Sequence, residues 1–478
     1  MGDPNAPLLG LLTVLAGLGA MLTGPRGDLD SAPLTAVIGS IVGAMALVAA
    51  VLGAAEIGRA FGMSHDHALT VAVSLACIGM LLGGIPILPS AALVLGALAL
   101  GILVVAMAVA TGAPPWTAWT RLASQPTRAF AAAAEWVTDG RTVAHATTLV
   151  FTEAHRVTAL SGGLFRVTEP GPIVREWRLS SGEALTLRAG DRLSLSPGMR
   201  VRFEAGKRIP GVAESGVAWA ELHSRLDWRA LGETLGLAIT LGGGAMALAG
   251  ASRGASPNGA ILAPLVLPVF VLGAASWGVY AAWLTPDLSI GASPLASLAA
   301  VLLVAAPPDL GRHMLAVAAI AGVLLLLATA GSLVRRLDSF IAPWAASRFA
   351  LRAVPSLLGA SALGFAVVLA WRGVEAKTVL CVALGLGASA WAAPRLAGDK
   401  GAAARGGVVG TAAFLALSLA ALAGFHAPAA LGEFPALGAA PLAAAVANLV
   451  RRRPGRVHAA RRPRPARVGC PEEGRLPQ

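Results

Sequence analysis

Long apolar stretches recur along the chain and constrain its fold more than any other feature. Each has 17 or more residues without a central charge, and about 20 such residues cross a hydrocarbon core about 30 Å thick. Four stretches precede a long polar segment and eight follow it, which predicts a polytopic α-helical membrane protein of about 12 spans (4 + 8). The predicted spans are 7–23, 33–55, 68–88, 90–111, 230–250, 259–284, 288–306, 314–334, 354–371, 378–394, 407–425 and 434–450.

The composition agrees with a membrane-embedded chain. Of the 478 residues, 56% are hydrophobic and 13% are charged, whereas a soluble protein carries roughly 25% charged residues. A mean hydropathy of +0.71 leaves too little polar surface to cover one large soluble core. It also excludes collagen-like and wholly disordered chains. The three cysteines, Cys77, Cys381 and Cys470, are scattered, so they form neither a disulfide framework nor a CxxC metal motif.

The distribution of arginine and lysine predicts the orientation, because loops rich in these residues stay in the cytoplasm. With 12 spans, 12 basic residues near the span ends fall on one side and five on the other, and the C-terminal segment joins the larger set. Both termini and the polar segment are therefore predicted to be cytoplasmic. Arginine outnumbers lysine 34 to 3 in a chain rich in alanine and glycine. Because this usage is typical of GC-rich bacterial genomes, we expect a bacterial inner-membrane protein.

Charge and hydropathy divide the chain into four regions. Residues 1–111 form an N-terminal membrane region of four spans, and residues 230–450 form a C-terminal membrane region of eight. Residues 112–229 are predicted to be a soluble β-rich domain, because they hold 26 of the 62 charges. Residues 451–478 contain nine arginines and a proline every few residues, which predicts a disordered basic tail that binds anionic membrane lipid. No aromatic residue is interleaved for stacking, so nucleic acid is not an expected partner.

The soluble domain opens with aromatic residues and then changes period. Trp116 and Trp119 follow the fourth span at once, as expected for rings at a membrane interface. The segment Ala129–Val137 has helical spacing and predicts a short helix. From Thr142 onward the apolar residues alternate, and the segments Thr147–Thr152, Leu164–Thr168 and Ile173–Leu179 are predicted strands.

Glycines recur every eight residues in this domain, at Gly182, Gly190, Gly198 and Gly206. Each can adopt a positive φ in a tight turn, and the apolar residues between the turns alternate onto one face. These are Leu185 and Leu187, Leu193 and Leu195, and Val201 and Phe203. The pattern predicts an antiparallel meander in a small barrel or sandwich. The turns resemble those of cupin-like barrels, but the segment lacks the HxH pair and the glutamate of a cupin metal site, so no family is assigned.

Histidines provide the candidate ligand sites. His65 and His67 flank Asp66 between two predicted spans, and a strand or turn would aim both imidazoles at one metal ion, whereas a helix would point them about 200° apart. A solvated polar turn is the favoured interpretation. His313 and His426 lie in loops on one predicted side, where paired histidines can serve as haem ligands, but no tryptophan-rich WxWD-like run lies between them. His145, His155 and His223 have no fixed spacing with a cysteine or a carboxylate pair. No metal and no cofactor is therefore predicted.

The spans and motifs favour a role other than catalysis. No span has an ionisable centre, because Glu56, Glu233 and Lys377 lie at or beyond span ends. Ion-coupled carriers usually have ionisable residues in the middle of their spans, where these residues form the ion pathway or proton relay. A proton- or sodium-driven pump of polar solutes is therefore disfavoured. No GxSxG, HExxH, Walker A or dinucleotide motif occurs. We therefore expect a non-enzymatic component of a membrane protein assembly whose β domain docks a protein partner or regulates the assembly. The alternatives are a transporter or flippase of an uncharged or lipidic substrate and, third, a membrane enzyme or haem-handling assembly factor.

Overall fold

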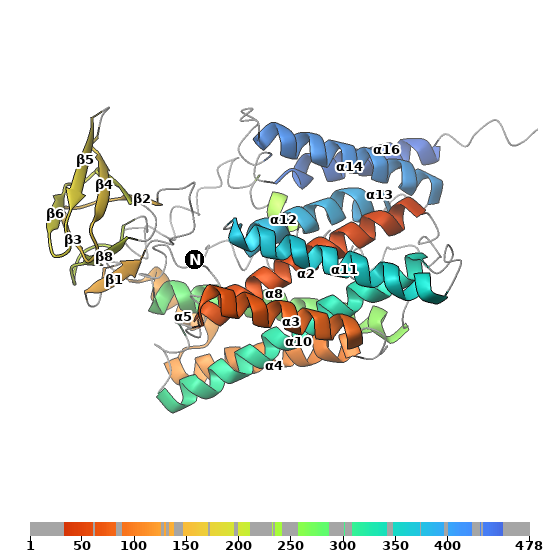
Figure 1. Ribbon diagram of the computed structural model, residues 1–478, viewed down its shortest axis with the longest axis horizontal. Coiled ribbons are helices and arrows are strands. Elements are labelled where there is room, and N and C mark those ends of the chain that lie inside the picture. The colour runs from red at the N-terminus through yellow and green to blue at the C-terminus, as the bar shows by residue number, and fades with distance from the viewer. Residues whose placement is uncertain are drawn as a thin grey trace, which may run out of the picture.

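A computed structural model of the chain combines a bundle of apolar helices with a separate group of strands (Figure 1). The structure describes residues 33–60, 63–82, 88–125, 129–130, 133–137, 147–170, 173–195, 199–210, 232, 235–240, 257–285, 301, 308–341, 348–372, 374–395, 400–422, 431 and 434–452. Predicted span 7–23 and the basic tail from residue 453 onward lie outside these residues. Most of predicted spans 230–250 and 288–306 also lies outside them.

The helices agree closely with nine of the predicted spans. They are α2 Pro33–Ala60, α3 His65–Leu82, α4 Leu88–Thr111, α5 Pro115–Ala123, α8 Pro257–Leu284, α10 Pro308–Ile341, α11 Arg348–Trp371, α12 Ala376–Gly387, the π-helix η3 Ala388–Ala392, α13 Ala393–Arg395, α14 Lys400–Leu422 and α16 Ala436–Arg452. The predicted span 378–394 is thus one helical rod, α12–η3–α13, with a π-turn inside it.

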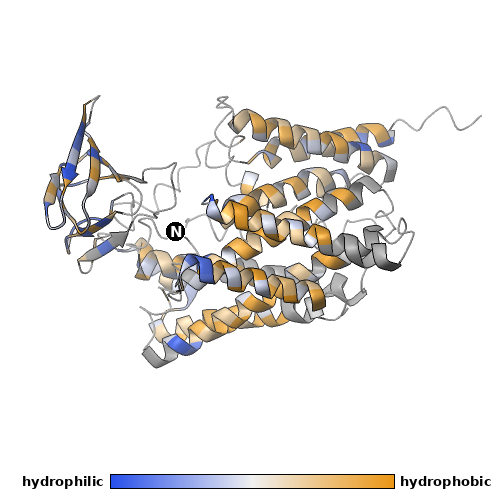
Figure 2. Cartoon of the chain, viewed as in Figure 1, coloured by the Kyte–Doolittle hydropathy of each residue, from blue (hydrophilic) through white to orange (hydrophobic). Residues whose placement is uncertain are grey.

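Five of these helices are long and apolar enough to cross a membrane, judged by length and composition. Their apolar segments are Ser40–Gly58, His65–Leu82, Val94–Thr111, Gly311–Gly331 and Gly401–Ala421. Leu357–Trp371, Ala376–Ala390 and Ala436–Arg451 are apolar but shorter. Figure 2 shows the same contrast, with largely hydrophobic helices and a more hydrophilic group of strands. The chain is therefore a multi-helix membrane protein, and the predicted count of 12 spans is not established.

The strands form two antiparallel sheets of four strands each. In chain order they are β1 Ala134–Val137, β2 Thr147–Val150, β3 His155–Ala159, β4 Gly163–Thr168, β5 Val174–Leu179, β6 Ala184–Leu187, β7 Arg192–Leu195 and β8 Arg200–Phe203. One sheet has the order β1-β8-β3-β6 and the other β2-β7-β4-β5. Successive strands therefore cross from sheet to sheet, except in the β4–β5 hairpin. This order is the double-sheet topology of a jelly roll.

Two predictions for this domain are wrong. The octad strands β6, β7 and β8 do not form a meander. Of the two predicted alternatives, barrel or sandwich, the two sheets correspond to the sandwich. A glycine turn reverses the chain but does not choose the strand with which the next segment pairs. Here each turn carries the chain across the core. The predicted helix Ala129–Val137 contains strand β1 instead, because Ala134–Val137 pairs with Arg200–Phe203 of β8.

The predicted alternation of the octad strands is confirmed. Leu185, Leu187, Leu193, Leu195, Val201 and Phe203 are all buried in the core between the sheets. The turn glycines have positive φ, at 91° for Gly182, 90° for Gly190 and 76° for Gly206. Gly198 lies outside the described residues. Residues with a side chain rarely adopt such angles. The glycines that recur every eight residues therefore do mark the turns between strands.

Helix α5 joins the β domain to the bundle. It begins after Pro114 and packs Ala118 and Leu122 inward against α8. The Arg121 guanidinium lies 5.5 Å from the centre of the Trp283 ring, and Trp116 is 73% exposed. Tyr280 of α8 donates a hydrogen bond of 2.8 Å to the carbonyl of Ala113, directly before α5. The end of α8 and the end of α4 therefore lie together beside the β domain, and we call this the domain end of the bundle.

Other contacts fix the direction of the remaining helices. Met314, near the start of α10, packs with Met107 and Tyr280 at the domain end, whereas Leu327 and Ala330 lie against Gly79 in the last turns of α3. The Ala376 N–H at the start of α12 donates to Glu56 Oε1, 3.3 Å away, near the end of α2. Helix α12 therefore starts at the domain end.

Helix α16 ends at the opposite end of the bundle. Helices α14 and α16 are antiparallel, because a Cβ on Gly410 would meet Ala443, and one on Gly438 would meet Leu417. Since α12–η3–α13 runs away from the domain end and α14 runs back, Arg452 at the end of α16 lies far from the β strands (Figure 1). We call this side the tail end.

These directions differ from the predicted topology. The β domain and the C-terminal end of α16 lie at opposite ends of the bundle, whereas 12 crossings would place them together. In addition, α8 ends and α10 begins at the domain end, and most of the predicted span 288–306 between them lies outside the described residues.

Candidate functional site

The most exposed element of the β domain is the strand β5. It lies at the edge of its sheet and pairs with β4. Its first five residues are exposed and its sixth, Leu179, is half-buried, so both faces of the strand are open. An edge strand presents a row of unpaired backbone N–H and C=O groups. The strand β5 is therefore a ready template for another strand.

Large apolar side chains accompany these open backbone groups. Trp177 is 43% exposed and Val174 is 49% exposed, and Ile173 and Leu164 beside them are similarly open. Trp177 lies opposite Phe165, whose side chain is fully buried in the core, so Trp177 extends the core-facing side of the sheet beyond the sandwich. Aromatic anchors of this kind dominate the binding energy of protein interfaces.

Two ion pairs tie β5 to its neighbours. Arg166 of β4 lies 3.0 Å from Glu176, and Arg175 lies 3.0 Å from Glu169. Among the described residues, Arg178 makes no ion pair. Exposed pairs of this kind contribute little to stability, about 0–1 kcal/mol each. They do fix the charge pattern that an approaching strand would meet.

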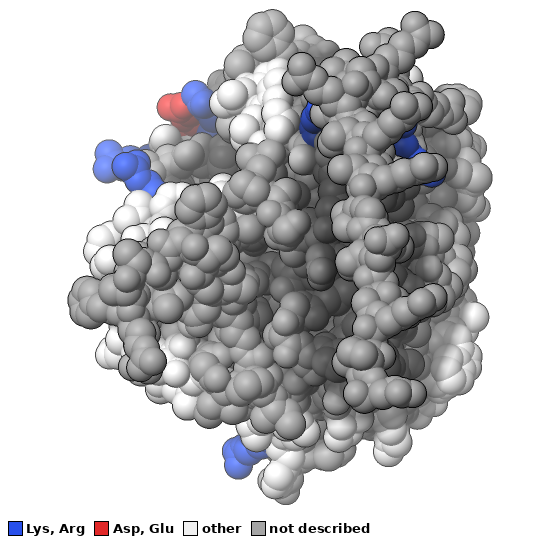
Figure 3. Space-filling view, turned by 90° about the vertical axis from the view of Figure 1, so that its right-hand side faces the viewer, with Lys and Arg blue, Asp and Glu red and all other residues white. Residues whose placement is uncertain are grey.

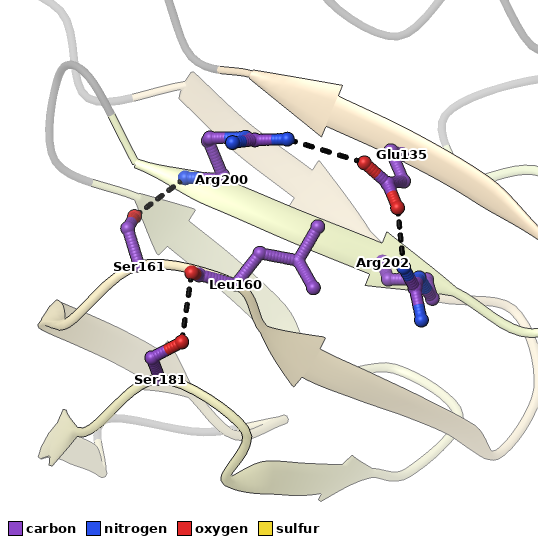
Figure 4. Close-up of polar contacts among 6 residues, drawn as sticks. All are labelled: Glu135, Leu160, Ser161, Ser181, Arg200 and Arg202. Atoms are coloured by element: carbon purple, nitrogen blue, oxygen red, sulfur yellow. Dashed lines mark hydrogen bonds and ion pairs between the residues drawn. The ribbon is translucent and has the colours of Figure 1, made fainter.

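The other sheet carries a charged outer face. Figure 4 shows Glu135 of β1 held between Arg200 and Arg202 of β8. The hydrogen bond from Arg202 holds the pKa of the Glu135 carboxyl below its usual range. At the edge of this face, Ser161 Oγ accepts a hydrogen bond of 2.8 Å from the Arg200 N–H, and Ser181 Oγ donates to the Leu160 carbonyl. These contacts tie β1, β8 and the adjoining turns together.

His155 lies inside the sandwich. It is 1% exposed. The centre of its imidazole ring lies 6.1, 5.4 and 5.5 Å from the ring centres of Phe130, Phe151 and Phe203. The rings of Phe130 and Phe203 also stack on each other, with their centres 5.3 Å apart. Neither ring nitrogen has a hydrogen-bond partner among the described residues. Burial lowers the pKa of this imidazole below 6.5, against the opposing influence of Glu153 and Glu204. Burial among these aromatic rings therefore favours the neutral imidazole.

The structure does not bring His65 and His67 to a common point. Both lie in the first turn of α3, where a separation of two residues points side chains apart. Ser64 Oγ lies 2.6 Å from His67 Nδ1 and accepts the backbone N–H of His67, so this segment forms a helix start. Within the described residues, no group of three His, Cys, Asp or Glu side chains has the geometry to hold a metal.

The structure describes only one histidine of the second candidate pair, His313 and His426. His313 lies in the second turn of α10, near the domain end, and His426 is outside the described residues. The prediction that His313 and His426 hold no haem therefore stays a prediction. Within the bundle, the buried hydroxyls of Thr285 and Ser389 donate to carbonyls four residues earlier in the chain.

Comparison with known proteins adds no functional label. The chain matches no protein-family model, and no curated protein is significantly similar to it. Sequence reasoning predicted a strand at Ile173–Leu179 but not its edge position. It also missed β3 and the burial of His155, although the alternation of His155, Val157 and Ala159 could have shown both.

Proposed function

We propose that this chain is a non-enzymatic, multi-pass component of a bacterial inner-membrane protein assembly and that its β domain is the docking surface. The observation that carries the proposal is the strand β5, which is open on both faces and at its edge. Soluble domains usually cover, shorten or twist such an edge. A strand that keeps Trp177 and Val174 exposed fits a partner that adds a strand.

We further propose that the β domain lies outside the cytoplasm. Basic residues in the short loops at the tail end outnumber those at the domain end, and Figure 3, which views the tail end, shows basic groups at several places on that face. Long domains are translocated largely regardless of their charge, so the short loops and the tail decide orientation. At the tail end these residues are Arg335, Arg336, Arg348, Arg352, Arg395, Lys400, Arg405, Arg451 and Arg452, and at the domain end they are Arg59, Arg312, Arg372 and Lys377.

This orientation replaces the predicted cytoplasmic position of the β domain. It keeps the arginine-rich segment after Arg452 on the cytoplasmic side, where anionic lipid attracts it. It also means that the docking partner approaches from the extracytoplasmic side.

The proposal is tested by the mass of the protein in its membrane. Polymer-extracted native membrane discs would be sized for the wild type, for Val174→Lys on β5, and for Thr186→Lys on the exposed face of β6 as the matched control. We expect a complex heavier than one 47.9 kDa chain that the Val174→Lys variant loses and the Thr186→Lys variant keeps. A wild type that occurs as single, partnerless chains, or a complex indifferent to Val174→Lys, would rule the proposal out.

A further inference from the structure

We propose that the partner of β5 is β5 of a second copy of this chain, paired antiparallel about a two-fold axis at Trp177. This inference rests on the proposed function, since it names the occupant of the docking surface. A two-fold contact of this kind uses the same patch on both copies. It would join the two β2-β7-β4-β5 sheets into one continuous sheet.

The backbone of β5 determines which residues can pair outward. The Glu169 N–H donates to the Ile173 carbonyl over 3.0 Å, and this pair continues the β4–β5 register that includes Thr168 opposite Val174. Hydrogen-bonding residues alternate along an antiparallel strand. Ile173, Arg175, Trp177 and Leu179 therefore direct their backbone groups to β4. Val174, Glu176 and Arg178 direct theirs to the open edge.

Charge and overlap together select one register among the two-fold pairings. A pairing centred on residue 175 or 178 sets arginine opposite arginine, and one centred on 176 sets glutamate opposite glutamate, all of which are unfavourable. A pairing centred on Val174 or Leu179 opposes no like charges, but it brings only that one residue of β5 opposite β5 of the second copy. The pairing centred on Trp177 sets Glu176 of each copy opposite Arg178 of the other. Both of these residues face the open edge, as the ladder requires. Pairings centred between residues would match an edge-facing group with a β4-facing one, so they form no ladder.

Side chains favour the same register. Trp177 would lie opposite Trp177 of the second copy in a non-hydrogen-bonded pair, the closer of the two antiparallel geometries, and each exposed ring would be covered by the other. Glu176 would lie between Arg166 of its own chain and Arg178 of the second copy. This domain already uses that arrangement, since Glu135 is held between Arg200 and Arg202.

Disulfide trapping in membranes tests the register. In the full-length chain with Cys77, Cys381 and Cys470 replaced by serine, Trp177→Cys would place two thiols opposite each other, within the about 4.4–6.8 Å Cα separation that a disulfide spans. The control is Val174→Cys, on the same strand and at least as exposed, whose two copies would lie about 20 Å apart. We expect oxidation to give a covalent dimer with Trp177→Cys and little with Val174→Cys. Equal cross-linking at both positions, or none at 177, would overturn the proposal.

A charge-complementation experiment separates the interface from any folding effect. In the Trp177→Cys background, Arg178→Glu alone sets Glu opposite Glu, and Glu176→Arg alone sets Arg opposite Arg, so each variant should lose cross-linking about tenfold. Co-expressed with different tags, the two variants restore both opposite-charge pairs and should cross-link to each other. Misfolded chains would not recover on mixing. Failure of the mixed pair to form would therefore refute the register.

The outcomes also separate this inference from the proposed function. If Val174→Lys reduces the native mass but Trp177→Cys gives no covalent dimer, a different protein occupies β5 and only the homodimer is wrong. If the native mass is that of one chain and no cross-link forms, both fail.

Discussion

A single methyl group on Gly410 should disrupt the C-terminal part of the bundle. Gly410 of α14 faces the π-turn η3 and α16, and a Cβ built on it would overlap the Ser389 carbonyl oxygen and lie 2.8 Å from Ala443 Cβ. Gly407 also lies close to η3, because its Cβ would lie 2.7 Å from the Ala390 carbonyl oxygen. Ser389 is fully buried, and a backbone carbonyl cannot rotate away as a flexible side chain can.

The expected cost follows from that geometry. Overpacking a well-packed core costs about 1–3 kcal/mol, and we expect Gly410→Ala to lie at the upper end, near 3 kcal/mol, because backbone must move. Gly322→Ala on α10 and Gly364→Ala on α11 are the matched controls, since nothing lies within 4 Å of a Cβ at either position. In these controls alanine should be neutral or should stabilise the helix by up to about 1 kcal/mol.

Unfolding of the purified chain in detergent micelles with increasing SDS would measure the three variants side by side. The double variant Gly410→Ala with Ala443→Gly removes one of the two clashes and should recover part of the loss. If Gly410→Ala unfolds at the same SDS fraction as Gly322→Ala, the close approach of α14 to η3 is wrong.

Three further predictions concern the β domain and the topology. Burial lowers the pKa of His155 below 6.5, so as the pH falls the unfolded chain protonates this imidazole before the folded chain does. The free energy of unfolding should therefore be constant above pH 6.5 and decrease as the pH falls below 6.5. Thermal unfolding across a pH series would measure this dependence, and His155→Phe should remove it. Gly190→Ala should cost about 1–3 kcal/mol by chemical denaturation, since φ is 90° and the new Cβ would lie 2.7 Å from Pro170 Cγ, and an unchanged midpoint would contradict this. Reporter fusions after Arg229 and Gln478 should report opposite sides of the membrane, with the latter cytoplasmic; the same side for both would refute the orientation.

The sequence predicts the local structure of this chain better than its connections. Alternation at Leu193 and Leu195 marks a strand because the period of side chains follows directly from backbone geometry. The sheet that this strand joins depends on contacts between distant segments, which no local pattern encodes. The short segment Ala134–Val137 shows the same limit, since its pairing with β8 overrides its helical spacing.

The candidate site is a further case of this limit. A strand over Ile173–Leu179 can be predicted, but its exposure cannot, because exposure depends on β5 being last in the order β2-β7-β4-β5. Close helix packing has the same limit. The approach of α14 at Gly407 and Gly410 depends on the π-turn η3, and a π-turn has no signature in this sequence.

One long-range contact constrains the direction of the helices more strongly than a count of hydropathy peaks does. The Glu56–Ala376 hydrogen bond joins residues 320 positions apart, and both lie at one end of the bundle. The chain between them must therefore pass from one end of the bundle to the other an even number of times. Among the described helices, α3, α4, α8, α10 and α11 each run between the two ends of the bundle, and α8 ends at the domain end, where α10 begins. The end of α10 and the start of α11 therefore lie at the tail end, together with the end of α13 and the end of α16. For this reason the arginines near Arg335 and Arg395 lie at the end of the bundle opposite the β domain, whereas the count of hydropathy peaks predicts them on the same side.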